Sequence, residues 1–499
     1  MRLNLILLLF LSVLSNAQEG GFNKNYYLNQ SMVSVCNDVF EAPNKNIIMV
    51  GLTYDTTYSN NSNRLTIICT DSTGNNILFR KDYGNNKFEY LDNILTSRKV
   101  FLTNNEFFIY SPAIDSNSVT LSALIKCNFN GDTIWQKRYY VSGGDLIIQG
   151  MNKSIDGGFL LTGFLQSPSW NYQNVLLIKT DINGNELWRK NIPSTNGANP
   201  VHDGRRLIQD STSKRIIIAG YQYIGTKVFS SILTLDSLGI KINQTSFSGV
   251  FGGVFTDLIQ TNDKHFVAVG SKDQGNNLGS SPRYKGHIVK FDLSSSLIWQ
   301  KETDTLSVYN LFSSINELQN GDLIICGHLD TLQNFNLLPS IRLRVQKLSS
   351  NGVLLKKYYT KSNSYLDSRY SKSCNLTNKK GVLLANQFAF SSNPRPYNII
   401  KLDSNFCDTA SKVCNPDIGI TGYILNKENT IIYPNPTRQH FTISNSLADF
   451  FVIENIYGQT LINGNIKEQV NIGELSSGVY TLKLFEANKI IYITKIIKE

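Results

Sequence analysis

The chain has 499 residues, a net charge of +10, and a charged fraction of only 17%. This length is enough for two or three domains. The basic residues are spread along the chain without a dense Lys/Arg run, which argues against a nucleic-acid surface, because such surfaces usually show a basic stripe.

Residues 1–17 have the pattern of a secretory signal peptide. Arg2 is the charged start, an apolar stretch runs from Leu3 to Leu14, and Ser15-Asn16-Ala17 fits a small-x-small cleavage site after Ala17. The apolar stretch is short for a bilayer span. No Cys follows the site as it would in a lipoprotein. We therefore expect an exported protein whose mature chain has no transmembrane segment.

Most of the chain repeats one pattern of short strands. The best copy of its hairpin is NVLLIKTDINGNELWRK at 174–190, in which an apolar run is followed by the turn Asp181 to Gly184 and a return strand. Ahead of each hairpin lies a strand that ends in a small residue, such as RIIIAG at 215–220. The four-strand units recur about every 55 residues, which is the mark of a β-propeller.

Seven such units predict a seven-bladed β-propeller over residues 18–405. The last unit has no convincing outer strand after Asp403, and residues 22–32 precede the first unit. We predict that the N-terminal segment completes the last blade, because closure of the ring removes open sheet edges that invite aggregation.

Seven cysteines follow the predicted cleavage site, and an exported location permits disulfides. Cys407 and Cys414 are close in sequence and flank a loop, so they are the candidate pair. Cys127 and Cys326 lie within strand patterns and are expected to be small apolar core residues. The Cys and His residues show no zinc spacing, so we predict no metal site and no cofactor.

Residues 406–430 lose the repeat and are predicted to be a linker, and a new pattern occupies residues 431–499. It begins with two prolines in Tyr433-Pro434-Asn435-Pro436, and short alternating strands with turns at Gly458 and Gly478 follow. These strands predict a small immunoglobulin-like β-sandwich.

The motifs of this last segment resemble, in order, the type A sorting domain of the type IX secretion system. They are Tyr433-Pro434-Asn435-Pro436, Phe441-Thr442-Ile443, Ile456-Tyr457-Gly458-Gln459, Leu475 to Leu482 with Gly478 and Tyr480, and Lys495-Ile496-Ile497-Lys498. The resemblance implies a Bacteroidota cell, Sec export into the periplasm, and the type IX machinery with its sorting protease as partners. It also implies removal of the domain, after which the protein is released or held at the cell surface.

The repeats resemble, more loosely, uncharacterised bacterial repeats with a K-x-D-x-x-G-x-x-x-W pattern, which Lys179, Asp181, Gly184 and Trp188 match. This likeness implies a fold and no activity. The turn Asp181 to Asn185 has the oxygen side chains that begin a calcium loop but lacks a later bidentate acid, so a hairpin turn is favoured.

Aromatic and basic residues recur at equivalent places in the repeats. Exposed aromatics can stack on sugars, but equivalent residues in several blades more often pack between blades, with Lys side chains extending outward. We therefore expect packing for Trp135, Trp188 and Trp299, followed by Lys137, Lys190 and Lys301.

Candidate catalytic chemistry is sparse. No GxSxG, HExxH or P-loop motif occurs. A glycosidase leaves no fixed spacing between its two carboxylates, so acids near the ends of expected inner strands are candidates for a channel mouth. These are Asp156, Asp203, Asp257 and Glu317, for which solvated loop carboxylates are the plainer interpretation.

The sequence thus predicts a secreted or cell-surface propeller that acts as a non-enzymatic binding or adhesion platform, with glycans or surface proteins as candidate ligands. The alternative is a secreted hydrolase that acts on polysaccharide or peptide with acidic residues at the propeller mouth. A structural surface protein without a small ligand is a third reading. Convergence of three or more carboxylates in one pocket would favour the hydrolase.

Overall fold

The computed structural model describes the chain as strands and turns, without a helix in its described part. Described residues are 21–28, 34–54, 63–85, 87–91, 99–168, 172–193, 202–224, 227–247, 252–274, 284–303, 310–330, 341–360, 369–377, 381–388, 396–404, 406, 431–444, 448–455, 459–466, 469–486 and 489–499. The predicted signal peptide with Ala17, the Cys407–Cys414 pair, Gly458 and nearly all of the predicted linker lie outside them. Two compact units divide the chain, Met1–Pro416 and Asp417–Glu499.

The described residues of unit 1 form seven antiparallel sheets, one for each predicted repeat. We number them in chain order as sheets 1 to 7. Sheet 1 holds β2 (Ser34–Glu41), β3 (Ile47–Tyr54), β4 (Asn63–Thr70) and β5 (Ile77–Tyr83); sheet 2 holds β6 (Phe88–Tyr90), β7 (Val100–Leu102), β8 (Glu106–Asp115), β9 (Thr120–Asn128) and β10 (Thr133–Tyr139); sheet 3 holds β11 (Asp145–Lys153), β12 (Phe159–Gln166), β13 (Gln173–Thr180) and β14 (Glu186–Ile192).

The later sheets repeat the four-strand order. Sheet 4 holds β15 (His202–Gln209), β16 (Ile216–Ile224), β17 (Lys227–Leu235) and β18 (Lys241–Ser246); sheet 5 holds β19 (Gly253–Gln260), β20 (Phe266–Asp273), β21 (Tyr284–Phe291) and β22 (Leu297–Glu302); sheet 6 holds β23 (Asn310–Glu317), β24 (Leu323–Asp330), β25 (Ile341–Leu348) and β26 (Leu354–Tyr359); sheet 7 holds β27 (Arg369–Leu376), β28 (Val382–Phe388), β29 (Tyr397–Leu402) and β1 (Phe22–Tyr26).

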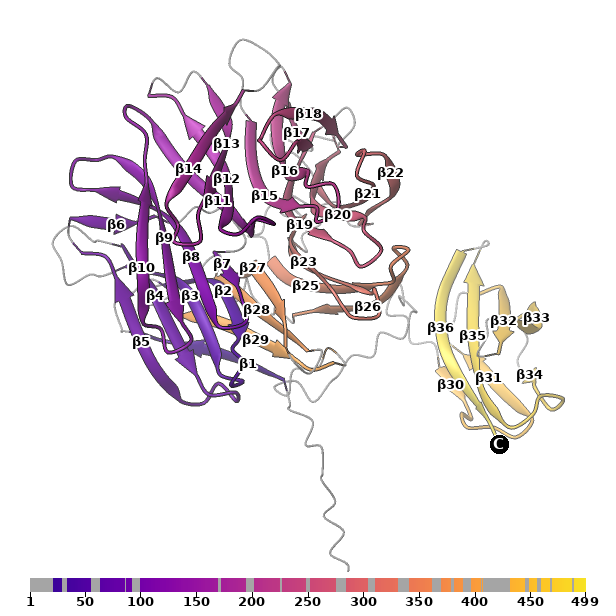
Figure 1. Ribbon diagram of the computed structural model, residues 1–499. Helices are drawn as coiled ribbons and strands as arrows, with labels where there is room; N and C mark the ends of the chain where they lie inside the picture. Colours follow the sequence, from indigo (N-terminus) through magenta and orange to yellow (C-terminus); the bar gives the residue numbers. More distant parts are fainter. Residues whose placement is uncertain are drawn as a thin grey trace, which may run out of the picture. The chain divides into compact units, whose positions relative to one another are not determined.

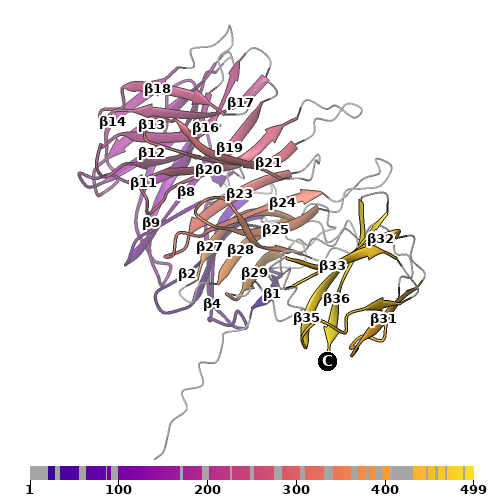
Figure 2. The same cartoon turned by 90° about the vertical axis from the view of Figure 1, so that its right-hand side faces the viewer.

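The sheets stand in chain order around a common centre, and the first strand of each faces inward, except in sheet 2, where the second strand, β7, takes this place (Figures 1 and 2). We call β2, β7, β11, β15, β19, β23 and β27 the inner strands. Apolar cores fill the space between neighbouring sheets; for example, residues of sheets 3 and 4 share one cluster, and residues of sheets 6 and 7 share another. The all-β, propeller-like fold predicted from the sequence is therefore present.

Strand β1 confirms the predicted closure of the ring. It pairs with β29 in antiparallel register, from Phe22 opposite Lys401 to Tyr26 opposite Tyr397. The last sheet is thus completed by the first described strand of the chain, which removes the open edge of β29.

The outer strands of neighbouring sheets are joined by a repeated contact between an aromatic residue and a turn glycine. Gly184 has a φ of 74°, and a Cβ added there would lie 2.7 Å from the Trp135 ring of sheet 2. The Tyr139 hydroxyl donates to the Gly184 carbonyl at 2.7 Å, and the Lys137 ammonium donates to Asn185 at 2.8 Å. Only glycine fits this left-handed, closely packed position without strain.

The same contact joins other pairs of sheets. Trp188 lies against Gly239 and Trp299 against Gly352, which confirms that these tryptophans pack between sheets. At the ring closure, the Tyr26 hydroxyl donates to the Gly74 carbonyl at 2.9 Å. The residues Phe22, Lys24 and Tyr26 of β1 therefore reproduce the spacing of Trp135, Lys137 and Tyr139 in β10.

Several local expectations are also borne out. Cys127 and Cys326 are fully buried, as small core residues should be. The Asp181 carboxylate accepts bonds from the Asn183 and Asn185 backbone N–H groups, both at 2.8 Å, which is hairpin-turn chemistry.

Unit 2 is formed by two small sheets around one core. One sheet has the order β30 (Ile431–Tyr433), β31 (His440–Ser444), β34 (Val470–Asn471). The other has the order β33 (Thr460–Asn465), β32 (Phe450–Glu454), β35 (Gly478–Glu486), β36 (Lys489–Lys498). Alternate residues of both sheets meet in the core, among them Phe441, Ile453 and Leu482.

We predict that closure by β1 stabilises unit 1. Tyr26 is 8% exposed, so Tyr26→Ala should lower the free energy of unfolding by about 3 kcal/mol, because a buried ring and its hydrogen bond are lost. Tyr27 is 61% exposed, and Tyr27→Ala should change the free energy of unfolding by less than about 0.5 kcal/mol. Denaturant unfolding followed by Trp fluorescence measures this, since every Trp precedes residue 300. Equal stabilities of the two variants would contradict the closing role.

Candidate functional site

A cavity of about 520 Å³ lies at the centre of unit 1. Its lining comes mainly from β7, β11, β15 and β19, with Phe40 added from β2, Tyr110 from β8 and Asn375 from β27. In β11, β15 and β19 the lining residues lie in the later half of each strand, so the cavity is on the face where these inner strands end. We call it the axial cavity.

A β-bulge in the inner strands positions the floor of this cavity. The pairing register shifts by one residue in β2, β11, β15, β19, β23 and β27, always in the middle of the strand. An extra residue re-aims the side chains that follow it. Directly after the bulge come Asp38, Arg206 and Asp257, which occupy equivalent places in sheets 1, 4 and 5.

Asp38 links three sheets through its carboxylate. One oxygen accepts bonds from the Ser373 hydroxyl at 2.6 Å and the Asn375 amide at 3.0 Å, both in sheet 7. The other accepts the backbone N–H groups of Lys99 and Val100 in sheet 2, each at 3.0 Å. The side chain is fully buried, so these donors replace the water that the charge has lost.

Asp257 makes the corresponding links between sheets 4, 5 and 6. One oxygen accepts the Arg206 Nε–H at 3.1 Å and the Leu258 backbone N–H at 3.0 Å. The other accepts the Ser314 hydroxyl at 3.1 Å and the Ile315 backbone N–H at 3.0 Å. This predicted acid is therefore a structural group in the described geometry.

Arg206 extends from sheet 4 across the floor of the cavity. Besides Asp257, its guanidinium donates to the Tyr110 hydroxyl of sheet 2 and to the Gln149 carbonyl of sheet 3 at 3.1 Å. Its side chain is 9% exposed, and its Nη2 has no hydrogen-bond partner. Burial raises the pKa of Tyr110, an effect that the neighbouring Arg206 opposes.

The four acids selected from the sequence do not meet at one mouth. Asp203 is the second residue of β15, whereas Glu317 is the last residue of β23 and Asp156 follows the end of β11. The inner strands run in the same direction, because strand ends contact strand ends: Glu317 accepts the backbone N–H of Asn262, just after β19, at 2.9 Å. Asp203 therefore lies on the opposite face from Asp156 and Glu317.

Each of the remaining three acids also has a local partner. Asp156 pairs with Lys179 at 2.7 Å; burial works to raise its pKa, but bonds from Lys179 and Ser154 lower it overall. Burial raises the pKa of Asp203, which accepts a bond from Gln149 at 3.3 Å. Burial likewise raises the pKa of Glu317. No group of three or more His, Cys, Asp or Glu side chains in the described residues is placed to hold a metal ion.

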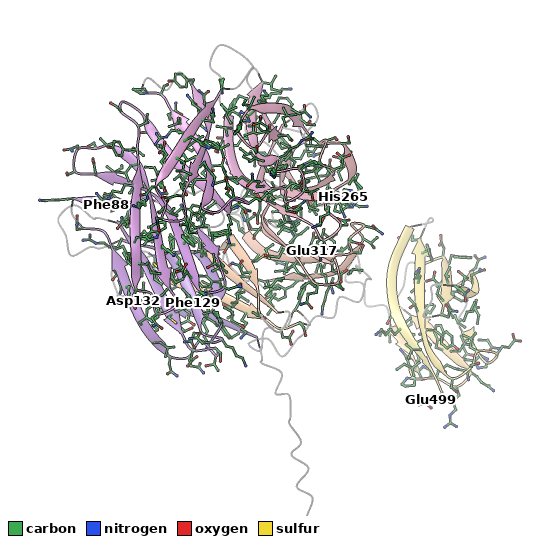
Figure 3. All side chains as sticks on the ribbon, viewed as in Figure 1. Phe88, Phe129, Asp132, His265, Glu317 and Glu499 are labelled. Atoms are coloured by element: carbon green, nitrogen blue, oxygen red, sulfur yellow. The ribbon has the colours of Figure 1, made fainter. Side chains whose placement is uncertain are left out.

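The sequence-based search selected Asp257 but missed Asp38 and Arg206. A buried acid inside a strand pattern, as in SVCNDVFE, is unusual and was the available signal. Figure 3 labels Glu317, the acid that bridges the ends of sheets 5 and 6.

In unit 2, the first and last sorting motifs are joined directly. The Asn435 side chain, between Pro434 and Pro436, donates to the Lys495 carbonyl at 2.7 Å and accepts the Ile497 N–H at 2.9 Å. Thr437 continues the pairing with the Ile497 carbonyl and the Glu499 N–H. Asn435 thus replaces a strand residue beside β36.

The other motif residues lie nearby in the fold or on its surface. Tyr480 is 9% exposed, and its hydroxyl donates to the Ser476 carbonyl at 2.6 Å, just before Gly478. Tyr433 is half exposed, and the Lys495 side chain is exposed, whereas Lys498 pairs across the backbone with Thr437.

We predict that Asp257 is needed for stability. Asp257→Ala leaves the buried Arg206 without its carboxylate and should lower the free energy of unfolding by about 3–5 kcal/mol. Asp156→Ala, whose side chain is 71% exposed, should cost less than about 1 kcal/mol. Denaturant unfolding of the full chain compares them. A wild-type midpoint for Asp257→Ala would show that the bridge contributes little.

Comparison with known protein families gives a match for the C-terminal unit. Residues 431–499 match the family described as the secretion system C-terminal sorting domain. No curated protein matches the chain. No helix that could span a membrane occurs in the part of the chain that the structure describes.

Solved propeller-like structures are similar only weakly. The β-propeller domain of the trilobed protease from Pyrococcus furiosus shares 8% identity over 75% of this chain and 94% of its own, with a TM-score of 0.40. A protein of unknown function from Dyadobacter fermentans shares 10% identity over 76% of this chain and 97% of its own, with a TM-score of 0.40. A sialidase from Streptococcus pneumoniae shares 10% identity over 78% of this chain and 70% of its own, with a TM-score of 0.38. At these values the matches say nothing about activity.

The sorting match agrees with the motifs from Tyr433 to Lys498 and with their contacts in unit 2. Such a domain directs a protein to the cell surface or the extracellular space. Residues 431–499 are therefore a C-terminal sorting domain of the type IX secretion system.

Proposed function

We propose that the exported protein is a non-enzymatic binding module whose ligand enters the axial cavity. The volume of about 520 Å³ lies within the usual range of small-ligand sites. The lining combines apolar side chains with amides and one ion pair, and more of its exposed surface is polar than apolar, so the cavity offers a ligand both packing and hydrogen-bond contacts.

The observation that carries this proposal is the state of Asp257. It is the one carboxylate among the residues that line the axial cavity, and both its oxygens accept bonds from three sheets. A glycosidase requires two carboxylates about 5–9.5 Å apart, one of which must exchange a proton with the substrate. A carboxylate whose oxygens are saturated by structural donors is poorly suited to that work.

The propeller can be tested with the full mature chain and a panel of polysaccharides, peptides and cell-surface glycoproteins. Retention on immobilised ligands and the release of products are scored on the same samples. Retention without new reducing ends or peptides is expected. Any product release would replace the binding proposal with the hydrolase. This holds even where the release survives in an Asp156→Asn, Glu317→Gln double variant. Neither retention nor products would favour a structural surface protein.

The export route gives a further prediction that centres on Asn435. Asn435→Ala removes two hydrogen bonds to β36, each contributing about 0.5–1.5 kcal/mol, and should release the strand that ends the sorting domain. In a host with this secretion system, the variant should accumulate severalfold in the periplasm at the expense of the surface and medium. Immunoblots of cell fractions measure the distribution.

Asn463 provides the matched control because it is exposed on β33. Asn463→Ala should be exported like the wild type. Normal export of Asn435→Ala would show that the link between the two motifs is not part of the signal.

A further inference from the structure

The outer strands of sheets 1 to 6 share an exposed feature at the point where they begin. The second residue of each is aliphatic and 45–60% exposed. Most of the other large aliphatic residues that are exposed in the described part of unit 1 flank these positions, such as Ile77 and Leu354. We call the six second residues the apolar rim: Leu78, Ile134, Leu187, Ile242, Ile298 and Leu355.

The apolar rim lies on the same face of unit 1 as the axial cavity. Neighbouring strands in each sheet are antiparallel, so an outer strand begins on the face where the inner strand of its sheet ends. Figure 3 labels Asp132, which lies two residues before Ile134 in the turn that leads into β10. Because the sheets stand around a common centre, the rim residues are arranged around the cavity instead of forming one patch (Figure 1).

The outer strands also carry the excess positive charge of the repeats. The seven of them, β1, β5, β10, β14, β18, β22 and β26, hold eleven Lys or Arg residues but only three Asp or Glu residues. Lys137, Lys190 and Lys301 each lie three residues after a rim residue, which is about 10 Å along a strand. Within the described residues these three lysines form no salt bridge, so their charges are not cancelled.

We propose that this face of unit 1 docks on an anionic lipid surface through the apolar rim. Apolar side chains of a protein that lies on a bilayer enter about 5–10 Å into the boundary between headgroups and acyl chains, whereas Lys and Arg stay near the lipid phosphates. With the outer strands upright on the bilayer, the step of about 10 Å from a rim residue to its lysine matches this layering. The inference goes beyond the proposed function, since it needs no ligand in the axial cavity.

The ring arrangement favours a lipid surface over a protein partner. A protein interface is usually one continuous patch with an apolar core. The rim residues instead belong to six sheets, with the axial cavity between them. A fluid bilayer can meet all six places at once, because it needs no complementary shape.

Co-sedimentation of the full mature chain with lipid vesicles tests the proposal. The anionic probe is a vesicle of phosphatidylethanolamine and phosphatidylglycerol, and the neutral probe is a vesicle of phosphatidylcholine. The chain should bind the anionic vesicles about tenfold or more tightly than the neutral ones. Binding should fall severalfold between about 0.1 M and about 1 M salt, because the screening length shortens from about 10 Å to about 3 Å. No binding to the anionic vesicles would overturn the proposal.

A rim variant tests the apolar contact. It carries four substitutions in four sheets, and each removes an aliphatic side chain that is about half exposed. Binding to the anionic vesicles should weaken about tenfold or more, since that apolar surface no longer enters the bilayer. The substitutions are Leu78→Ser, Leu187→Ser, Ile298→Ser and Leu355→Ser.

The matched control removes four exposed apolar residues from the opposite face. They lie at the other ends of outer, second or third strands and are 40–62% exposed. This variant should bind like the wild type. Wild-type binding by the rim variant, or equal losses in both variants, would overturn the assignment of the rim. The control substitutions are Tyr27→Ser, Tyr140→Ser, Tyr172→Ser and Ile224→Ser.

A charge variant tests the lysines separately. Lys190→Gln with Lys301→Gln removes two cations that lie behind rim residues, and should weaken binding to the anionic vesicles about tenfold. Its binding to the neutral vesicles should be unchanged. Undiminished binding to the anionic vesicles would show that these cations do not face the lipid.

Sedimentation velocity separates a lipid surface from a second copy of the chain. The chain should be a monomer without vesicles. A dimer that the rim variant dissociates would assign the apolar rim to contact between copies and overturn the proposal.

Discussion

Two buried aspartates hold the inner strands of unit 1 in register. Asp38 joins sheets 7, 1 and 2, and Asp257 joins sheets 4, 5 and 6. Within a sheet, ladder hydrogen bonds fix the strands, but among the described residues the ladders stop at the sheet boundary. Neighbouring sheets are held together by apolar packing, which is not directional. They are also held by the hydrogen bonds of these aspartates, which are directional. The charged side chains of Asp38 and Asp257 at the ring centre therefore serve mainly to hold the sheets together.

The periphery uses a second cross-link of neutral groups. An aromatic ring from one outer strand packs on a turn glycine of the next sheet, and a Tyr hydroxyl bonds the same turn. Strand β1 makes this contact with Gly74, so the N-terminal strand is integrated as an ordinary outer strand. The inner and outer links together leave the axial cavity between fixed walls. A site that is fixed before binding loses little entropy when the ligand arrives.

In the sorting domain too, side-chain hydrogen bonds join segments that are far apart in the sequence. Asn435 and the β36 residues that it bonds are about sixty positions apart, yet they form one feature at the end of the unit. The first and last motifs are therefore one structural element.

The sequence alone determined the strand repeat, the packing of Trp135 and its equivalents, and the sorting domain, because these follow from period-two patterns and turn chemistry within short windows. The spacing of Phe22, Lys24 and Tyr26 matches that of Trp135, Lys137 and Tyr139, but this match was recognised only in the structure. Only the tertiary structure decided that the acids separate onto two faces and that Arg206 meets Asp257. Bulges set where those side chains point, and their partners lie 51 to 335 positions away, where no local spacing can reveal them.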